Sequence, residues 1–164
     1  MKLADYIVQI AKGELGVEEV DGTNCGPRVN EYKAATNLPS TEPWPWCAAF
    51  VDWVVREAMK AANVKETATF HRPTTAGAWA LEAWSLAQDS TTHTKKPHRG
   101  DILPGDIIVF TFSHTGFAVS APDINNYVTT IEGNTDGQGS REGGAVLRKR
   151  RLTSSIRSRI RFTV

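Results

Sequence analysis

The sequence has few cysteines, no long hydrophobic run and almost no net charge. Two cysteines in 164 residues are too few for a metal–thiolate cage or a disulfide-rich scaffold. The sequence contains no run of about eighteen apolar residues, which is the length that a membrane-spanning helix needs. Its first residues do not resemble a secretory signal peptide. A net charge of +1 argues against a general nucleic-acid binder. We therefore expect a protein made in the cytosol, without an export signal, with reduced cysteines and no nucleic-acid partner.

The charges are distributed unevenly along the chain. Residues 1–140 carry a net charge of −6, whereas residues 141–164 carry +7. In one interpretation, Ile156, Ile160 and Phe162 alternate with arginines because a half-buried strand turns a basic face to water. In the other, the basic C-terminal region forms a patch that attracts an anionic envelope surface. Surface binding that is lost at high salt would favour the second interpretation.

Hydrophobic periodicity predicts helices in the first half of the chain and strands in the second. This order indicates an α+β domain rather than repeated βαβ units, and the length suits one compact domain over residues 1–164. A glycine-rich hairpin loop is expected over 133–144. The predicted elements are helices over 3–15, after a capping Asn24, over 47–63 and over 75–87, a polar loop over 88–100, and strands over 107–112, 115–121, 127–132, 145–150 and 158–163.

Cys47 is the candidate nucleophile. It follows Pro43 and Pro45, which hold the chain extended, and it opens the strongest predicted helix. The helix dipole and the unpaired N–H groups of the first turn favour a thiolate over a thiol, and the thiolate is the nucleophilic form. The same N–H groups can stabilise the oxyanion of a tetrahedral intermediate. A small buried cysteine that only packs within the helix is the alternative.

His114 is the candidate base. It lies between two apolar strands, whereas the other three histidines are in polar surroundings. Gly116 would allow another segment to approach closely. If the strands beginning near 115 and 127 pair as a hairpin, Glu132 or Asn134 can lie beside His114 and orient its second ring nitrogen. A hydrogen-bonded core histidine and a surface glutamate are the simpler alternatives.

Four short motifs, in their order and spacing, resemble those of the CHAP-domain cysteine peptidases and amidases. They are PWCAAFV at 45–51, PGDIIVF at 104–110, HTG at 114–116 and IEGNT at 131–135. That family is related to the NlpC peptidases within the papain-like fold. The resemblance covers about residues 3 to 150 and implies a papain-like α+β fold, with N-terminal helices packed on a C-terminal antiparallel sheet.

The resemblance also implies a reaction. It is the hydrolysis of an amide bond in bacterial peptidoglycan through a thioester formed on Cys47. His114 would be the general base, Glu132 would orient it, and Asn134 would support that network. Either the lactyl–L-alanine bond (an amidase) or a peptide bond (an endopeptidase) could be cut, because both reactions need the same residues.

The segment before Cys47 contains two tryptophans and lacks the acidic residues of a calcium site. Trp44 and Trp46 are candidate walls of the substrate cleft, with packing as the alternative for each. Some CHAP enzymes bind calcium through an Asp-rich segment around the nucleophile, but here that segment holds prolines and tryptophans. The loop at 21–26 lacks the ligand pattern of a calcium loop. We therefore expect no metal and no cofactor.

The leading functional hypothesis is a phage or prophage endolysin, monomeric and without a separate wall-binding domain. It would reach the cell wall from the host cytoplasm after release through the membrane. One alternative is an antibacterial effector amidase that is delivered by a secretion machine and has an immunity partner. A non-catalytic wall-binding module of the same fold is another.

Overall fold

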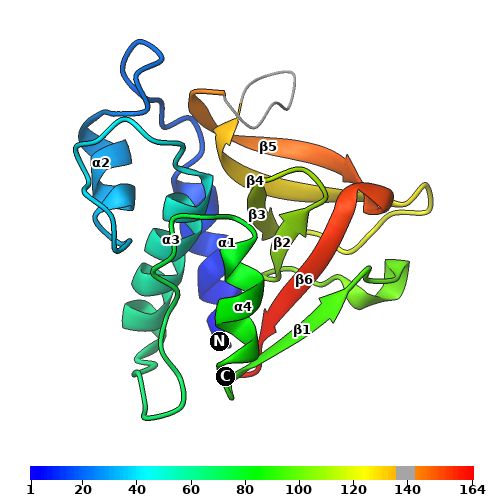
Figure 1. Cartoon of the computed structure of the whole chain (residues 1–164). Coiled ribbons are helices and arrows are strands. Elements are labelled where there is room, and N and C mark those ends of the chain that lie inside the picture. The colour runs from blue at the N-terminus through cyan, green and yellow to red at the C-terminus, as the bar shows by residue number, and fades with distance from the viewer. Residues whose placement is uncertain (136–142) are drawn as a thin grey trace.

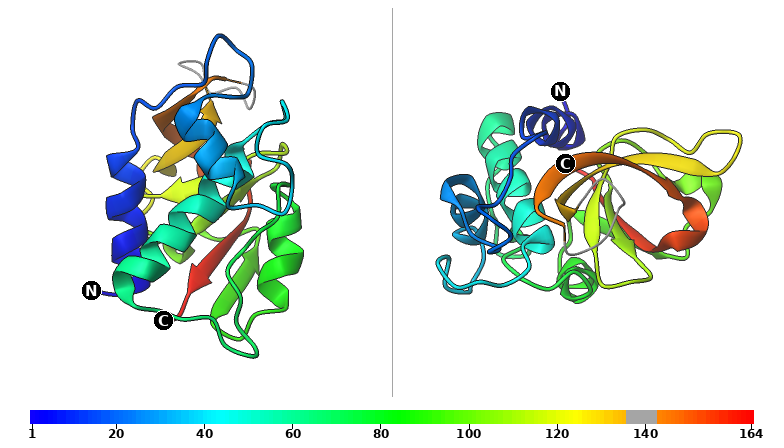
Figure 2. Two further views of the ribbon diagram at one scale, coloured as in Figure 1. Left: turned by 90° about the vertical axis from the view of Figure 1, so that its left-hand side faces the viewer. Right: turned by 90° about the horizontal axis from the view of Figure 1, so that it is seen from above.

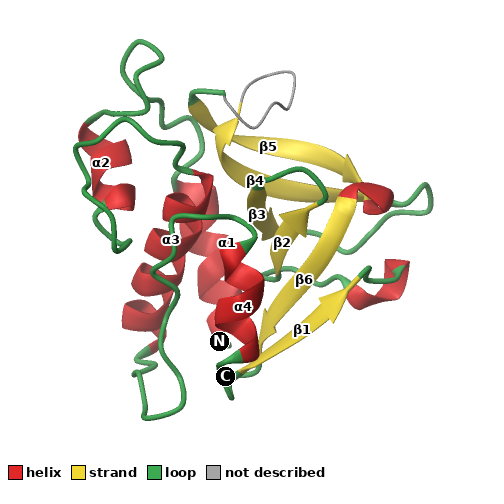
Figure 3. Ribbon diagram, in the orientation of Figure 1, coloured by secondary structure: helices red, strands yellow, loops and turns green. Residues whose placement is uncertain are grey.

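The computed structural model describes residues 1–135 and 143–164. Within these ranges the chain forms four α-helices and a six-stranded antiparallel sheet (Figures 1 and 3). No helix in the described ranges is both long enough and apolar enough to cross a membrane. The helices are α1 (Leu3–Gly13), α2 (Pro27–Lys33), α3 (Cys47–Ala62) and α4 (Ala80–Leu86).

The sheet has the strand order β1-β6-β2-β3-β4-β5, so the last strand of the chain lies between two earlier ones. The sheet curls strongly, as the view from above shows (Figure 2). Helices first and an antiparallel sheet afterwards confirm the predicted α+β class. The strands are β1 (Thr91–Lys95), β2 (Ile107–Phe110), β3 (Thr115–Ala118), β4 (Tyr127–Thr135), β5 (Ala145–Leu152) and β6 (Ile156–Phe162).

The main core lies between the helices and one face of the sheet. Helix α3 is buried along most of its length because its apolar side chains contact α1 and α2 on one side and β3 and β4 on the other. In β2, Ile107 and Val109 point into this core, whereas Ile108 and Phe110 pack in a second cluster on the opposite face. Both faces of β2 are therefore buried, and the loop that follows it is held from two sides.

Four predicted elements differ from the observed ones. The predicted loop over 88–100 contains β1, a polar edge strand that pairs with β6. Its residues do not alternate between apolar and polar, so the sequence pattern does not indicate a strand there. Helix α4 begins at Ala80 rather than 75. Asn24 does not cap α2, because Gly26 occupies that position and Asn24 has a left-handed φ of 55°. Residues 133–135 of the predicted glycine-rich loop extend β4, and residues 136–142 lie outside the described ranges.

Candidate active site

Cys47 is the first residue of α3, and its side chain is only 6% exposed. It lies at a hollow of about 220 Å³ between the loop before α3 and the segment before α4. Both cysteines are free thiols, so no disulfide competes for the sulfur. The other residues around this hollow are mostly small or apolar: Leu38, Trp44, Pro45, Ala76, Gly77, Ala78 and Ser113.

The two tryptophans before Cys47 have different environments. Trp44 lines the hollow, and its indole N–H donates to the carbonyl of Pro39 at 2.9 Å. Trp46 is fully buried and stacks on Tyr32, with ring centroids 5.7 Å apart. The expectation that Trp46 walls the cleft is therefore wrong: Trp46 is the N-cap residue of α3, where the backbone leaves the extended conformation (φ −118°, ψ 18°), and its ring is packed in the core.

A buried lysine fixes the loop that carries Trp44. Lys33 is fully buried, and its ammonium donates to the carbonyls of Asn24 at 2.8 Å and Glu42 at 2.5 Å. It also donates to the Cys25 sulfur at 3.4 Å and lies 5.2 Å from the Trp44 ring centroid. Lys33 thus joins the loops on both sides of α2, and Cys25 contributes to this structural junction.

His114 lies just before β3 and is completely buried. Its Nε2 is 2.9 Å from Oε1 of Glu132, on the neighbouring strand β4. The imidazole stacks on Phe110 and Phe112, with ring centroids 5.7 and 5.8 Å away. The histidine ring is therefore fixed both in its plane and along its hydrogen-bonding edge.

Gly116 makes this approach of two strands possible. A Cβ added there would lie 2.6 Å from Cγ of Glu132 and 2.7 Å from the carbonyl oxygen of Ile131. Only glycine leaves enough room for the Glu132 side chain to cross β3 and reach His114. The structure thus explains the HTG motif by the space that its third residue leaves.

The Glu132 carboxylate accepts four hydrogen bonds. Oε1 accepts from His114 and from Nη2 of Arg151, while Oε2 accepts from the Thr130 hydroxyl and from Nε of Arg151 at 2.8 Å. Burial would raise the pKa of Glu132, but its bonds with Arg151 and His114 outweigh burial and lower the pKa to about 2. Glu132 is therefore a fully paired carboxylate at neutral pH.

The ionised Glu132 determines the state of His114. A carboxylate only accepts hydrogen bonds, so Nε2 of His114 must carry a proton. Nδ1 is buried and has no hydrogen-bond partner that meets the usual distance and angle limits within the described ranges, so it is available to the Cys47 side chain. Burial opposes the charge on His114, but hydrogen-bonding and charge interactions with Cys47 and Glu132 raise its pKa to about 9.

Asn134 is buried at the end of β4, where its φ is 56°. Neither its amide nitrogen nor its amide oxygen has a hydrogen-bond partner in the described part of the chain. The structure therefore places Asn134 two residues from Glu132, but it gives no hydrogen bond from Asn134 to His114 or Glu132. The orienting contact belongs to Glu132.

Asp52 is a second buried carboxyl near Cys47, on the next turn of α3. Neither of its oxygens has a hydrogen-bond partner among the described residues. Burial raises the pKa of Asp52 well above its usual range, and the nearby Cys47 adds to this effect while Arg72 opposes it. Asp52 is thus disposed to stay protonated where an exposed aspartate is ionised.

The donor set around Cys47 does not suit calcium. Within 1–135 and 143–164, no group of three or more His, Cys, Asp or Glu side chains is arranged to hold a metal ion. A calcium ion takes six to eight oxygen ligands, and Asp52 alone supplies carboxylate oxygens on this turn of α3.

The sequence does not point to Lys33 or Arg151 as residues of the site. Arg151 ends the basic run of β5, for which the sequence predicts a solvated or attractive face, yet its side chain is only 15% exposed and binds Glu132. Its guanidinium also packs over the rings of Phe110 and Phe112, at 5.0 and 5.3 Å from their centroids. A run of four basic residues gives no signal for which one turns inward.

Comparisons with known proteins agree with this site. The chain matches no curated protein, but it is similar to the crystal structure of a wild type endolysin, LysIME-EF1, with a TM-score of 0.58 and 16% identity. That alignment covers 99% of this chain and 65% of the endolysin chain, so this chain spans less than two thirds of its length. A family model described as the CHAP domain matches residues 39–134, more than half of the chain and a range that contains Cys47, His114 and Glu132. The chain therefore belongs to the CHAP domain family.

Proposed function

We propose that the protein is a peptidoglycan hydrolase that cleaves an amide bond with Cys47 as its nucleophile. The observation that carries this proposal is the environment of His114: its Nε2 is bound to the Glu132 carboxylate, and its interaction with Cys47 contributes to the raised pKa of the ring. The name of the similar solved structure, an endolysin, supports a cell-wall substrate.

At neutral pH both ring nitrogens of His114 carry a proton because its pKa is raised to about 9, and the reactive species is the Cys47 thiolate paired with this imidazolium. The sulfur attacks the carbonyl carbon of the amide, and backbone N–H groups at the start of α3 stabilise the oxyanion. The C–N bond then breaks as His114 returns its proton to the leaving amine, and a thioester remains on Cys47. Water attacks the thioester while His114 accepts its proton, the C–S bond breaks, and the product carboxylic acid is released as Cys47 returns to the thiolate paired with protonated His114.

Glu132 acts throughout as a fixed partner of His114. Because it stays ionised, it holds the Nε2 proton and stabilises the imidazolium that forms in both steps. The small walls of the hollow, Ala76, Gly77 and Ala78, leave room for a peptide with small side chains, and Trp44 offers a flat apolar surface. These features favour a short peptide or a peptide–sugar junction as the segment bound there.

The decisive experiment compares the protein with Cys47→Ala on suspensions of purified peptidoglycan. We expect the parent to clear the suspension and the variant to lose at least about 10³-fold in rate while remaining folded. A Cys47→Ala variant that clears walls as fast as the parent would contradict the nucleophile assignment. If neither protein acts on any wall preparation, a non-catalytic wall-binding module becomes the better interpretation.

The bond that is cut, and the biological setting, need separate measurements. Mass spectrometry of the digested wall distinguishes a new L-alanine amino terminus, which an amidase produces, from a new peptide terminus inside the stem or cross-link. We propose the endolysin setting, in which one catalytic domain reaches the wall from the host cytoplasm. Toxicity that a neighbouring gene product relieves would instead indicate a delivered effector with an immunity partner.

A further inference from the structure

Much of the positive charge of the basic C-terminal region is paired with carboxylates of the same chain. Four of its arginines bind carboxylates of earlier segments: Arg150–Asp123, Arg151–Glu132, Arg157–Glu82 and Arg161–Asp106. Arg141 and Glu142, also counted in that region, lie outside the described ranges. These ion pairs reduce the positive charge that the region can offer to a ligand, and one attractive patch over 141–164 stays a prediction.

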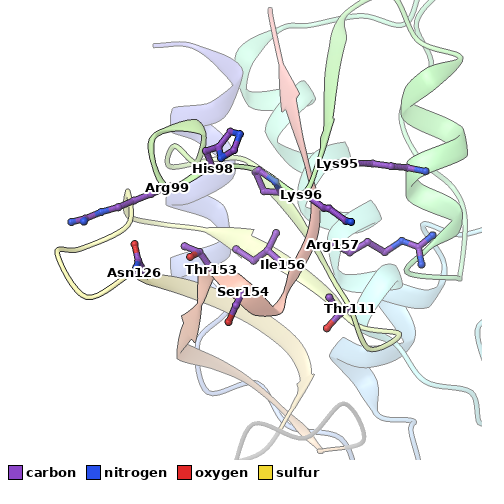
Figure 4. A pocket seen from close by; sticks show the side chains of 11 residues that line it. Lys95, Lys96, His98, Arg99, Thr111, Asn126, Thr153, Ser154, Ile156 and Arg157 are labelled. Atoms are coloured by element: carbon purple, nitrogen blue, oxygen red, sulfur yellow. The ribbon is translucent and has the colours of Figure 1, made fainter.

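A larger hollow than the Cys47 cleft lies on the side of the sheet away from α1 and α3 (Figure 4). It has a volume of about 710 Å³ and is formed by the end of β1, the loop after it, the loop between β2 and β3, and the start of β6. Its charged lining is entirely basic, and no aspartate or glutamate is among the residues that form it. The basic side chains are Lys95, Lys96, His98, Arg99 and Arg157.

These cations lie on two sides of the pocket. Lys95, Lys96 and Arg157 lie on one side of it, and Arg99 extends on the other (Figure 4). Between them the wall is formed by Ile156 together with hydroxyl and amide groups of neighbouring residues. A ligand lying across this wall would meet positive charge at both ends and neutral hydrogen-bonding groups in the middle.

Two of these cations have no ion-pair role in the described structure. Arg157 is bound to Glu82 at 2.5 Å and packs on Trp79, and the Lys95 ammonium is 4.0 Å from the same Glu82. Lys96 and Arg99, in contrast, form no ion pair with any residue of the described ranges. Uncompensated neighbouring cations repel one another, so an anion bound between them would remove an unfavourable interaction.

The backbone at Lys96 is also unusual. Its φ is 48°, a left-handed conformation that lysine adopts rarely, and its N–H donates to the carbonyl of Arg157 at 2.8 Å. The fold therefore holds Lys96 at the rim in an unfavourable conformation through its contact with β6. Residues in such conformations cluster at ligand-binding sites.

We propose that this pocket binds an anionic polymer whose charges are phosphodiester groups. Separated lysine and arginine side chains suit successive tetrahedral phosphates, and the hydroxyl groups of Thr111, Thr153 and Ser154 suit the polyol that links them. The volume admits more than one repeating unit. Trp79 and the β2–β3 loop separate the pocket from the cleft, so the bound polymer would tether the protein while the cleft stays open.

Binding can be tested apart from hydrolysis, with the full chain and soluble poly(glycerol phosphate) in a titration at low and at physiological salt. We expect the double variant Lys96→Gln/Arg99→Gln to bind about tenfold more weakly than the parent. The matched control is Lys12→Gln/Lys65→Gln, which removes the same charge from exposed sites elsewhere and should bind as the parent does. An equal loss in both variants would overturn the proposal, because only net charge would then matter.

The probe also tests the chemical class of the ligand. Polyglutamate of similar length should bind at least about tenfold more weakly than poly(glycerol phosphate), and inorganic phosphate should compete only at high concentration. Polyglutamate that binds equally well would show that the pocket does not prefer phosphodiesters. Cys47→Ala should bind the polymer as the parent does. The binding result can therefore be interpreted even if the protein proves not to be a hydrolase.

Wall digestion provides an independent measurement. On walls that carry a phosphodiester polymer, the Lys96→Gln/Arg99→Gln variant should act several-fold more slowly than the parent at low enzyme concentration. On the same walls after chemical removal of that polymer, the two proteins should act equally fast. A variant that is slower on both preparations would show that the pocket binds peptidoglycan itself.

Discussion

Arg151 donates two hydrogen bonds to Glu132, one from Nε and one from Nη2, and thereby holds the carboxylate that binds His114. This pairing is bidentate, buried and stacked on Phe110 and Phe112, so it differs from an exposed ion pair of long side chains. Arg151 is therefore a positioning residue that acts through Glu132.

Replacing Arg151 with Gln should lower both stability and activity. Removing one partner of a buried ion pair costs about 3 kcal/mol. A lowered carboxyl pKa contributes stability above the unfolded value near 4.5, and this stability is lost as pH falls toward the folded value of about 2. Without Arg151 the folded pKa rises, so we expect the acid limb of the activity profile to move to higher pH.

The matched control is Arg150→Gln, one residue earlier on β5. Arg150 pairs with Asp123 at the surface, and its side chain is 58% exposed. Its loss should leave activity and the acid limb unchanged in the same assays. Arg151→Lys keeps the charge but not the two-pronged contact, and should restore only part of the activity. If Arg151→Gln shifts no pH limb, Arg151 is merely structural.

The pKa of His114 should fall when Cys47 is replaced with Ala. The pKa of about 9 depends partly on the sulfur, so removing that partner should bring the value closer to 6.5. The raised pKa means that protonated His114 stabilises the folded state fully below pH 6.5, and that this stabilisation is lost as pH rises toward 9. Titration of the His114 ring protons by NMR in both proteins measures the shift. An unchanged value would mean that the thiol and the imidazole do not interact.

Asp52→Asn should make the protein more stable at neutral and alkaline pH. Burial raises the folded pKa of Asp52, so the unfolded chain releases this proton first and wild-type stability falls as pH rises above about 4. Asparagine cannot ionise, and thermal unfolding between pH 4 and 9 should show a gain that grows with pH.

Glu57→Gln, on the same helix, provides a comparison of opposite sign. Despite partial burial, hydrogen bonds from Lys60 and Arg56 lower the pKa of Glu57, so its loss should reduce stability at neutral pH rather than increase it. Two variants that shift in the same direction would contradict the assignment for Asp52.

Gly116→Ala should displace Glu132. The added methyl would lie 2.6 Å from Cγ of Glu132, and relieving this contact should cost about 1–3 kcal/mol of stability. We also expect a loss of activity greater than the loss of folded protein explains. Gly13→Ala, where no atom lies within 4 Å of the added carbon, should keep full activity and equal or higher stability. Chemical denaturation and wall-clearing rates measure both effects.

The sequence predicted those features that arise from local patterns. The apolar stripe after Cys47 marks α3, the left-handed Asn63 ends it, and the hairpin of β3 and β4 brings Glu132 to His114 as expected. What it could not predict depends on contacts between distant segments. The polar strand β1 is specified by pairing with β6, and the inward turn of Arg151 depends on where Glu132 lies.

Trp46 illustrates the same limit at a single position. The two tryptophans lie two residues apart, and the sequence gives no reason to place one at the surface and the other in the core. The path of the backbone before α3 decides which of them contacts solvent. Trp44 lies at the hollow, while Trp46 fills the space beside Tyr32 and Phe50 in the core.

The position of β6 inside the sheet has a consequence for synthesis on the ribosome. This strand follows the site residues in sequence, joins β1 to β2, and comes only a few residues after Arg151. A nascent chain that already contains Cys47, His114 and Glu132 must therefore wait until β6 has emerged from the exit tunnel before the sheet closes. Translation would delay the contact between Arg151 and Glu132 in the same way, because β5 also follows the site residues.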